Sequence, residues 1–320
     1  MAFNVAALGD YTKQSLTPLL TSAVLGAKTQ EMIVKSGILL TGVKSAEAIP
    51  LIDTDAAFQA DACGWAPSGS TTFTQRTVTV GKVRINEAFC PKDLEPKFTQ
   101  EALNAGSTYE NFGNSDFEAA FLDKKNKRIA AQNDIAIWQG NTSSGDENLK
   151  RYDGLIKLID AGSPIDANVN GFTGAGVIAA ITSANVISVV RAVKNAIPAA
   201  LKGLTDVVIF CGYDVYDLYV DAGVTANLFH YNFNDESNYG GLKVPGTGIR
   251  LEAVHGLDGT GDLYAMRMSN VAMGVDIEGE ENNYKLWYSQ DNDEVRFRAA
   301  WKLGVNVAFT TECVKFKSTI

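Results

Sequence analysis

Residues 174–179 (GAGVIA) fit the G-x-G-x-x-A pattern of loops that bind dinucleotides. In such a site a hydrophobic strand comes directly before the glycines, so that the pyrophosphate meets the start of the next helix. Here the preceding residues 168–173 (NVNGFT) have the composition of a loop. The pattern therefore predicts a turn, and no cofactor is expected.

The chain has two histidines and four cysteines, residue types that serve as catalytic bases, nucleophiles and metal ligands. His230 lies in an aromatic stretch and His255 precedes a glycine-rich turn, with no G-x-S-x-G or H-E-x-x-H motif beside either. The four cysteines are Cys63, Cys90, Cys211 and Cys313. They form no C-x-x-C pair, so we expect separate thiols and no catalytic or metal-binding residues.

Two further stretches could bind a ligand. Residues 291–294 (DNDE) are acidic, but their spacing lacks the glycine and the distal glutamate of an EF-hand calcium loop. Residues 229–233 (FHYNF) could form an aromatic pocket, although packing in a core or an interface explains them equally well. A soluble α/β enzyme or ligand-binding protein therefore stays an alternative that lacks a constellation of site residues.

Composition describes an ordinary folded chain. Of its 320 residues, 46% are apolar and 20% are charged, and the net charge of −9 gives no basic face for gripping nucleic acid. The densest cationic group, Lys124, Lys125, Lys127 and Arg128, lies on a predicted helix. We interpret it as a solvated or intersubunit face. No apolar run approaches the ~20 residues that cross a bilayer, so no membrane contact is expected.

Residues 295–309 (VRFRAAWKLGVNVAF) alternate between apolar and mostly polar side chains. The apolar row is Val295, Phe297, Ala299, Trp301, Leu303, Val305, Val307 and Phe309, and Arg296, Arg298, Lys302 and Asn306 lie on the other row. A period of two predicts one strand of ~50 Å at ~3.3 Å per residue. Residues 284–289 should pair with it through the turn at 290–293. A strand of this length favours an elongated molecule that reaches its neighbours.

Residues 56–90 predict a long β-ribbon whose turn lies at 64–70 (GWAPSGS). Its polar residues occupy both faces, so it has little core and should be ordered mainly by a neighbouring subunit. Residues 1–50 predict an extended arm with one short helix starting near Thr17. A helix is expected over 116–138, where Lys124 and Arg128 interrupt the apolar stripe. A helix at 182–201, a buried strand at 206–211 and several further strands predict a mixed α/β module.

This order of parts resembles the major capsid protein of tailed bacteriophages, the Hong Kong 97-type fold that encapsulins share. Residues 63–73 and 78–89 resemble that family's extended loop and its return, and 116–138 resemble its spine helix. Residues 152–155 (YDGL) resemble the turn after that helix, and 269–276 (SNVAMGVD) with the final hairpin resemble the C-terminal stretch. The resemblance covers about residues 50–316.

The resemblance implies an α+β Hong Kong 97-type capsid fold in four parts. These would be an N-terminal arm (1–50), an extended loop (51–95), a peripheral domain with the spine helix (96–160 and 276–320) and an axial domain (161–275). The chain would then be a phage coat protein that is not an enzyme. It would assemble in the host cytoplasm as pentamers and hexamers into the icosahedral capsid of a virion.

The partners implied are further copies of the chain, portal, scaffolding and decoration proteins, and packaged double-stranded DNA held without sequence-specific binding. An encapsulin-like compartment that encloses protein cargo is the alternative within the same fold. The expected intersubunit contacts are Trp65, Phe73, Arg76, Lys82, Arg84, Lys124 and Arg128. Among them, Arg76, Lys82 and Arg84 are expected to pair with acidic surface on an adjacent copy.

Overall fold

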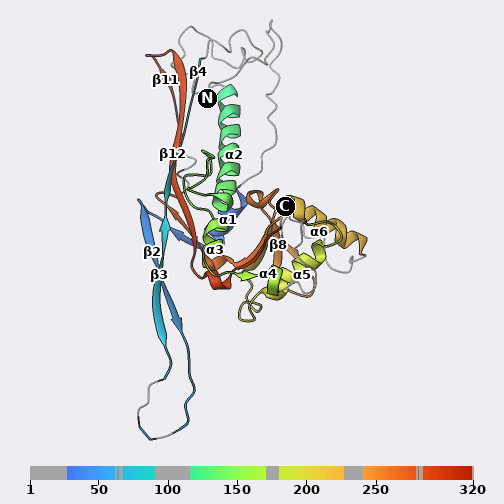
Figure 1. The fold of residues 1–320 in the computed structure, drawn as a ribbon. Helices are drawn as coiled ribbons and strands as arrows, with labels where there is room; N and C mark the ends of the chain where they lie inside the picture. The colour runs from blue at the N-terminus through green and yellow to red at the C-terminus, as the bar shows by residue number, and fades with distance from the viewer. Residues whose placement is uncertain are drawn as a thin grey trace.

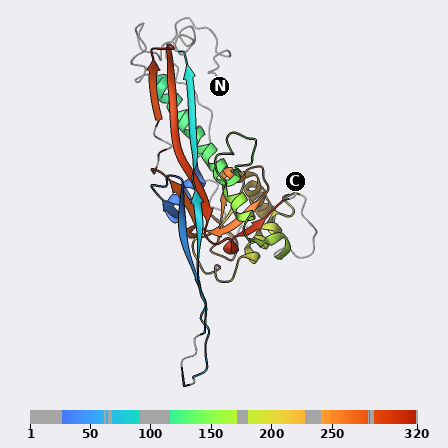
Figure 2. The same cartoon turned by 60° about the vertical axis from the view of Figure 1, so that its left-hand side comes forward.

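The computed structural model describes residues 27–61, 63–64, 68–90, 116–170, 180–226, 241–278, 280 and 284–318. Within these residues, a long sheet and a parallel helix form one end of an elongated body, and a mixed α/β module lies at its side (Figure 1). A two-stranded ribbon projects from the opposite end, as both views show (Figures 1 and 2). The long strand, the helix and the ribbon were all expected from the sequence, and together they give the molecule its elongated shape.

The long sheet is organised around β12 (Glu294–Val307). One edge of β12 pairs with β11 (Tyr284–Ser289) and then with β10 (Val271–Val275), which in turn pairs with β1 (Ile38–Leu40). The other edge pairs with β4 (Gly81–Phe89). The predicted single strand and its hairpin with 284–289 are confirmed, and the apolar row of β12 from Val295 to Val307 is buried throughout.

Helix α2 (Asp116–Gln139) covers the apolar face of this sheet, and the predicted spine helix is confirmed. The sequence predicts an apolar stripe of Phe117, Ala120, Phe121, Ala131, Ile135 and Trp138 on this helix. The buried side chains include Leu122, Ile129 and Ile137 from outside that stripe, whereas Ile135 is only half-buried. The stripe was misplaced because Lys125 also faces the sheet, where it pairs with Glu87. Helices α1 (Lys28–Ser36) and α3 (Leu155–Asp160) pack against the lower half of α2. No described helix has the length and apolar character needed to cross a membrane.

The expected ribbon over 56–90 is wrong in its pairing. Strand β2 (Ala46–Thr54) pairs with β3 (Thr71–Thr79), so the outgoing strand begins in the predicted arm and ends before residue 56, and β4 leaves the ribbon to join β12. Val80 separates β3 from β4, and there the chain passes so close to Gly304 that a side chain at 304 would collide with Thr79. Residues 64–70 lie within the connection between β2 and β3, and residues 65–67 of the predicted turn lie outside the described residues. Strand β4 was assigned to the ribbon because it continues the stretch rich in Thr, Val and Ile that begins at Thr71.

The α/β module contains a six-stranded sheet in the order β5-β13-β9-β6-β8-β7. The strands are β5 (Ile165–Asp166), β6 (Val207–Cys211), β7 (Leu242–Lys243), β8 (Arg250–Ala253), β9 (Leu263–Arg267) and β13 (Val314–Phe316). Helices α4 (Ala167–Asn170), α5 (Val186–Ala196) and α6 (Tyr213–Thr225) belong to it, with short 3-10 turns η3 (His255–Leu257), η4 (Met268–Asn270) and η6 (Thr310–Glu312).

Strand β6 is buried on both faces, which explains its uninterrupted apolar sequence. Val207 and Ile209 point into the core under α5 and α6, whereas Val208 and Phe210 belong to the core that also contains Trp138 of α2. The ring centroids of Trp138 and Phe210 lie 5.2 Å apart. The module is therefore joined to the long sheet through the C-terminal end of α2.

Three predictions for this module need correction. The helix expected over 182–201 spans only Val186–Ala196, because Ile197 precedes Pro198 and takes an extended conformation. Strand β10 belongs to the long sheet, although it was expected in the module, and β13 from the C-terminal region joins the module. The apolar stripe that the sequence predicts at Val186, Val189, Val190, Val193 and Ile197 is buried, with Ile197 just past the end of α5. The four domain boundaries themselves stay predictions, and the expected helix near Thr17 lies outside the described residues.

A buried carboxylate holds three parts of the chain together. Asp134 of α2 is fully buried, and it accepts hydrogen bonds from the backbone N–H groups of Thr29 in α1 (2.9 Å) and Gly256 in η3 (3.0 Å). The indole N–H of Trp138 donates to the hydroxyl of Thr29 at 2.8 Å. Burial raises the pKa of Asp134, against the opposing effect of these hydrogen bonds and of the nearby His255. These hydrogen bonds thus fix α1, α2 and the α/β module to one another at a single point.

We predict that Asp134→Ala destabilises the unassembled subunit by roughly 2–4 kcal/mol, because two buried N–H donors lose their acceptor. The measurement is urea unfolding followed by circular dichroism. Asp123→Asn, on the exposed part of the same helix, is the control and should change stability by less than about 0.5 kcal/mol. Equal losses for both variants would contradict the role of Asp134.

The same carboxylate should also make stability depend on pH. Because its folded-state pKa is raised, its contribution is full below the unfolded-state value of about 3.9 and is lost as pH rises through the folded-state value. We expect the wild-type subunit to lose stability relative to Asp134→Asn as pH rises from about 4 upward, because the folded-state pKa lies above that of the unfolded chain. A difference between the two that stays constant over this range would contradict the assignment.

Candidate interaction surface

Pairing between β4, β12 and β11 places one row of polar side chains on the face of the long sheet that is turned away from α2. Residues directly opposite in antiparallel strands share a face. The register joins Lys82 to Lys302, Arg84 to Ala300, Asn86 to Arg298, Lys285 to Arg298 and Trp287 to Arg296. We call this surface the cationic face, and its charged members are Lys82, Arg84, Lys285, Arg296, Arg298 and Lys302.

Two cations of this face already have partners. Lys302 pairs with Asp276 at 2.9 Å, and Arg296 pairs with Glu294 at 2.6 Å. Hydrogen bonds from Lys44 and Lys302 hold the pKa of Asp276 below its ordinary value, and the bond from Arg296 does the same for the pKa of Glu294. Among the described residues, the cations of this face without an ion pair are Lys82, Arg84, Lys285 and Arg298.

Like charges lie directly opposite each other at two places on the cationic face. Lys82 opposes Lys302, and Lys285 opposes Arg298. Such pairs are destabilising in a sheet, and the effect is smaller at Lys82 because Lys302 is already paired with Asp276. The arrangement therefore destabilises the lone subunit slightly and favours an anionic partner.

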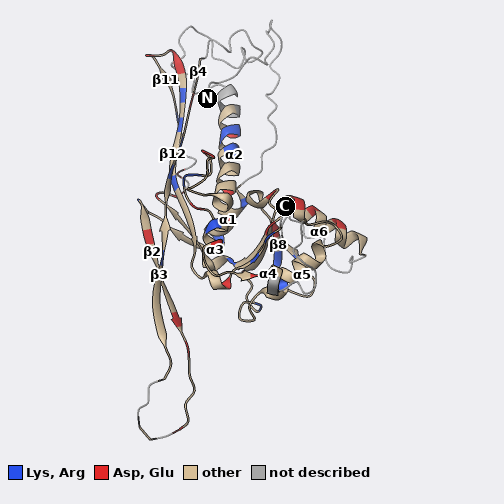
Figure 3. Cartoon of the chain, in the orientation of Figure 1, with Lys and Arg blue, Asp and Glu red and all other residues tan. Residues whose placement is uncertain are grey.

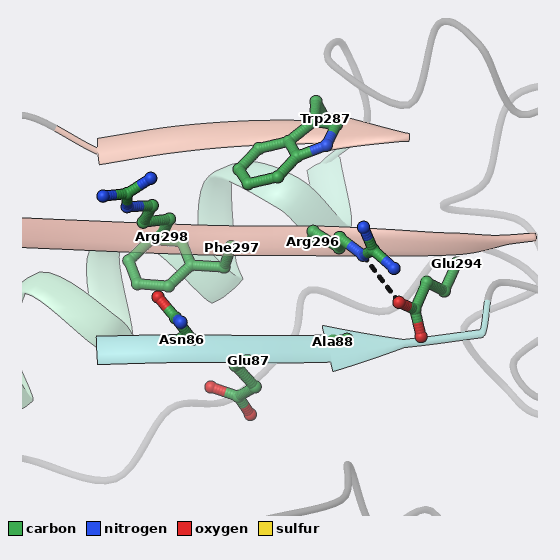
Figure 4. Close-up of a pocket in the computed structure, with 8 residues that line it drawn as sticks. All are labelled: Asn86, Glu87, Ala88, Trp287, Glu294, Arg296, Phe297 and Arg298. Atoms are coloured by element: carbon green, nitrogen blue, oxygen red, sulfur yellow. Dashed lines mark hydrogen bonds and ion pairs between the residues drawn. The ribbon is translucent and has the colours of Figure 1, made fainter. Parts of the chain in front are cut away.

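The cationic face is hollowed in two places that share Arg298. A depression of about 620 Å³ lies over the upper part of the sheet (Figure 4), and its lining includes Asn86, Trp287, Glu294, Arg296 and Arg298. The second, of about 470 Å³, is lined by residues that include Lys82, Arg84, Arg151, Arg298 and Lys302. Figure 4 shows Arg296 and Arg298 on β12, Trp287 on β11 and Glu87 on β4. Both hollows are open, which suits an extended polypeptide or another polymer better than a small molecule.

The ribbon is a second exposed surface, and its charge is opposite in sign to that of the cationic face. Of its eighteen strand residues, only Ile49 and Val78 are buried, and both lie at its base. Ile52 and Phe73 are cross-strand partners, yet 57% and 76% of their surfaces are exposed. Figure 3 shows acidic segments on β2, in contrast to the basic segments along β12 and β4. An exposed apolar pair on a ribbon without a core is typical of a surface that another molecule covers.

The structure separates the residues that the sequence suggested as intersubunit contacts. Phe73 is exposed on the ribbon, and Lys82 and Arg84 lie together on the cationic face. Arg76 lies near the base of the ribbon, and its guanidinium donates to the carbonyl of Val307 at 3.3 Å. Trp65 lies outside the described residues.

Lys124 and Arg128 lie on α2, away from the cationic face. Lys124 is half-buried, and its partial desolvation, with Arg128 and Lys127 nearby, lowers its pKa. Arg128 is exposed.

Sequence reasoning missed Lys285, Trp287 and Arg298 as members of the same surface as Lys82. The alternation of β12 showed that Arg296 and Arg298 share a row, but nothing in the sequence indicated that β4 would pair with β12. A search for cations at alternate positions in every predicted strand would have found both rows without showing that they adjoin.

Candidate chemistry outside this surface finds no support among the described residues. They contain no group of three histidine, cysteine or acidic side chains that could hold a metal ion. Burial raises the pKa of Cys313 to about 12 and also raises the pKa of Cys211, so both thiols stay protonated. The 174–179 motif, His230 and the aromatic stretch at 229–233 lie outside the described residues.

Comparison with solved structures shows what this architecture is similar to. The capsid of an empty GTA particle matches with a TM-score of 0.58 and 9% identity, covering 97% of this chain and 96% of the other. The capsid of Myoviridae phage XM1 gives 0.58 and 11%, covering 95% and 96%. The satellite phage P4 procapsid structure, which includes the size determination (Sid) protein, gives 0.56 and 12%, covering 91% and 88%. No protein-family model and no curated protein sequence matches the chain.

The chain has the Hong Kong 97-type capsid fold. The matches span nearly the whole chain, so the long sheet, spine helix, module and ribbon belong to one shared architecture. The α+β fold class and the resemblance noted in the sequence are both confirmed. Identities near 10% mean that the arrangement of elements, not the residue types, carries the likeness.

We predict opposite effects for neighbouring substitutions on β12 in the unassembled subunit. Phe297→Ala should destabilise it by about 3–5 kcal/mol, because the buried ring packs on Phe121 under α2. Arg298→Ala should be neutral or stabilise it by up to about 1 kcal/mol, because a like-charge pair with Lys285 is removed.

Chemical denaturation of the two variants beside the wild type measures both effects. A marked loss of stability in Arg298→Ala would contradict the uncompensated charge of the cationic face. Arg296→Ala is the matched control, because that side chain has a carboxylate partner in Glu294.

Proposed function

We propose that this chain is the major capsid protein of a tailed phage, and that it assembles as pentamers and hexamers into an icosahedral shell around double-stranded DNA. The observation that carries the proposal is the near-full-length likeness to the GTA and XM1 capsids. Portal, scaffolding and decoration proteins are the further partners, the virion is its location, and assembly takes place in the host cytoplasm. Its role is structural and not enzymatic.

The physical argument for self-assembly comes from the ribbon. A two-stranded ribbon is marginally stable in water without further packing, and this one leaves Ile52, Phe73 and Phe58 exposed. In a closed symmetric assembly every subunit has further copies of the same chain as neighbours, so another copy can cover each ribbon. Each contact then needs to contribute only modestly, because a shell repeats it in every subunit.

The first test is the size of what the purified chain forms. Size-exclusion chromatography with negative-stain microscopy should show megadalton shells or rings of five and six subunits. A lone monomer or a small oligomer under all assembly conditions would contradict the proposal and favour a soluble enzyme or binding protein. Nucleic acid extracted from shells made during infection separates a DNA container from a compartment for protein cargo.

Reversal of charge at Lys82 and Arg84 tests the predicted intersubunit contacts. Both side chains are exposed and have no ion pair among the described residues, so Lys82→Glu with Arg84→Glu should leave the subunit folded and block shell formation. Circular dichroism checks the fold and microscopy counts the shells. Normal shells from this variant would refute the pairing.

Arg76 needs a separate variant, because Arg76→Glu also removes a hydrogen bond to Val307 of its own chain. A loss of shells in that variant counts towards the pairing only if the unfolding midpoint of the subunit is unchanged.

A further inference from the structure

The ribbon and the α/β module both leave the long sheet near its lower end (Figure 1). At the base of the ribbon, the side-chain amide of Asn306 in β12 donates to the carbonyl of Thr77 at 2.7 Å. Asn306 is buried, and its own side-chain oxygen accepts the N–H of Val307 at 2.7 Å. These hydrogen bonds attach the ribbon to the long sheet.

Arg76 of the ribbon reaches past the end of β12. Its half-buried guanidinium donates to the carbonyl of Val307 at 3.3 Å and to the hydroxyl of Thr310 at 3.5 Å. Thr310 is buried and is the first residue of η6. One planar, charged side chain therefore holds two points on the segment that leads from the long sheet to the module.

Three connections carry the described chain between the long sheet and the module. They are residues 161–164 between α3 and β5, 268–270 between β9 and β10, and 308–313 between β12 and β13. The hydroxyl of Thr310 accepts the N–H of Ser163 at 3.4 Å, and a side chain at Gly162 would collide with Thr310. The first and third connections thus meet at the residue that Arg76 contacts.

The second connection is bonded to the third. The side-chain amide of the buried Asn270 donates to the carbonyl of Phe309 and accepts its N–H, both at 2.7 Å. Arg267 in β9 forms a bidentate ion pair with Glu312 in η6, with N–O distances of 2.6 and 3.2 Å. We call the three connections together the junction, and Thr310 is its point of contact with the ribbon.

We propose that Arg76 couples the direction of the ribbon to the orientation of the module, through Val307 and Thr310. A displacement of β3 moves the guanidinium, and the junction moves with it because its connections are bonded to one another. A molecule that deflects the ribbon then also turns the module without touching it. The coupling is a property of the single subunit, so its tests use unassembled subunits, and their failure leaves the proposed function unaffected.

The first measurement is hydrogen exchange of the junction amides. The N–H of Cys313 donates to the carbonyl of Thr310, and the N–H of Ile165 donates to the carbonyl of Cys313. Arg76→Ala should speed the exchange of these amides at least about threefold, because local opening needs less free energy once the ribbon no longer holds η6. The amides of β6 are the reference and should keep their wild-type rates.

Asn306→Ala is the matched control, because the hydrogen bonds of Asn306 join the ribbon to β12 and do not involve η6. It should leave the junction amides unchanged. Arg76→Lys keeps the charge but lacks the planar fork that reaches two acceptors, so it should behave like Arg76→Ala. Junction amides that keep their rates in Arg76→Ala, or that change equally in Asn306→Ala, would overturn the proposal.

The second measurement follows the coupling in the opposite direction, from the module to the ribbon. Spin labels on Cys63 at the ribbon tip and on an introduced Lys35→Cys in α1 report the spread of ribbon directions by double electron–electron resonance. Both positions are exposed. The chain carries Cys90→Ser, and the buried Cys211 and Cys313 stay unlabelled.

Arg267→Ala breaks the ion pair with Glu312 on the module side of the junction. With Arg76 present it should widen the distance distribution at least about 1.5-fold, and with Arg76→Ala it should add nothing further, because the link is already absent. Equal widening in both backgrounds, or none in either, would overturn the coupling. Thr310→Val removes the acceptor while keeping the side-chain shape, and it gives the same test if Arg76→Ala fails to fold.

Discussion

The two-residue period of β12 is the constraint on which the other features depend. Successive side chains of a strand point to opposite faces, so its apolar row lies under α2 and its cationic row faces outward. Pairing with β4 and β11 widens both rows without changing their character. A register shift of one residue would place Arg298 under the helix and Phe297 in solvent, so the buried face fixes the register of the entire sheet.

The core lies at one place and the extensions reach away from it. Trp138, Asp134 and Thr29 join α2, α1 and the six-stranded module, and β6 is buried between the two halves of the core. Among the described residues, the ribbon is supported at its base, by Ile49, Val78 and the hydrogen bond from Arg76 to Val307. A subunit built in this way is well defined where it folds on itself, and its extensions gain packing only from other subunits. Repetition over a closed shell multiplies contacts that are individually modest.

Elements with strong periodicity could be predicted from the sequence. The strand from Val295 to Val307 and the buried side of α5 were predicted because burial on one side imposes a pattern that residues reveal locally. Helix α2 was also predicted, although its buried side was misplaced. The partners of those elements could not be predicted in the same way. Nothing local shows that β4 pairs with β12 or that β2 starts at Ala46, since pairing is decided by contacts far apart in the chain. The sequence did not single out Asp134, because a buried carboxylate reveals itself only through its hydrogen-bond donors.

The central claim is that copies of the chain complete each other's fold at the ribbon. Hydrogen exchange of the amides in β2 and β3, compared between unassembled subunits and shells, tests it most directly. Amides above the base of the ribbon should exchange close to the rate of an unprotected chain in the free subunit, while those of β6 stay protected, and shell formation should protect both. Ribbon amides in the free subunit that are protected as strongly as those of β6 would contradict the account.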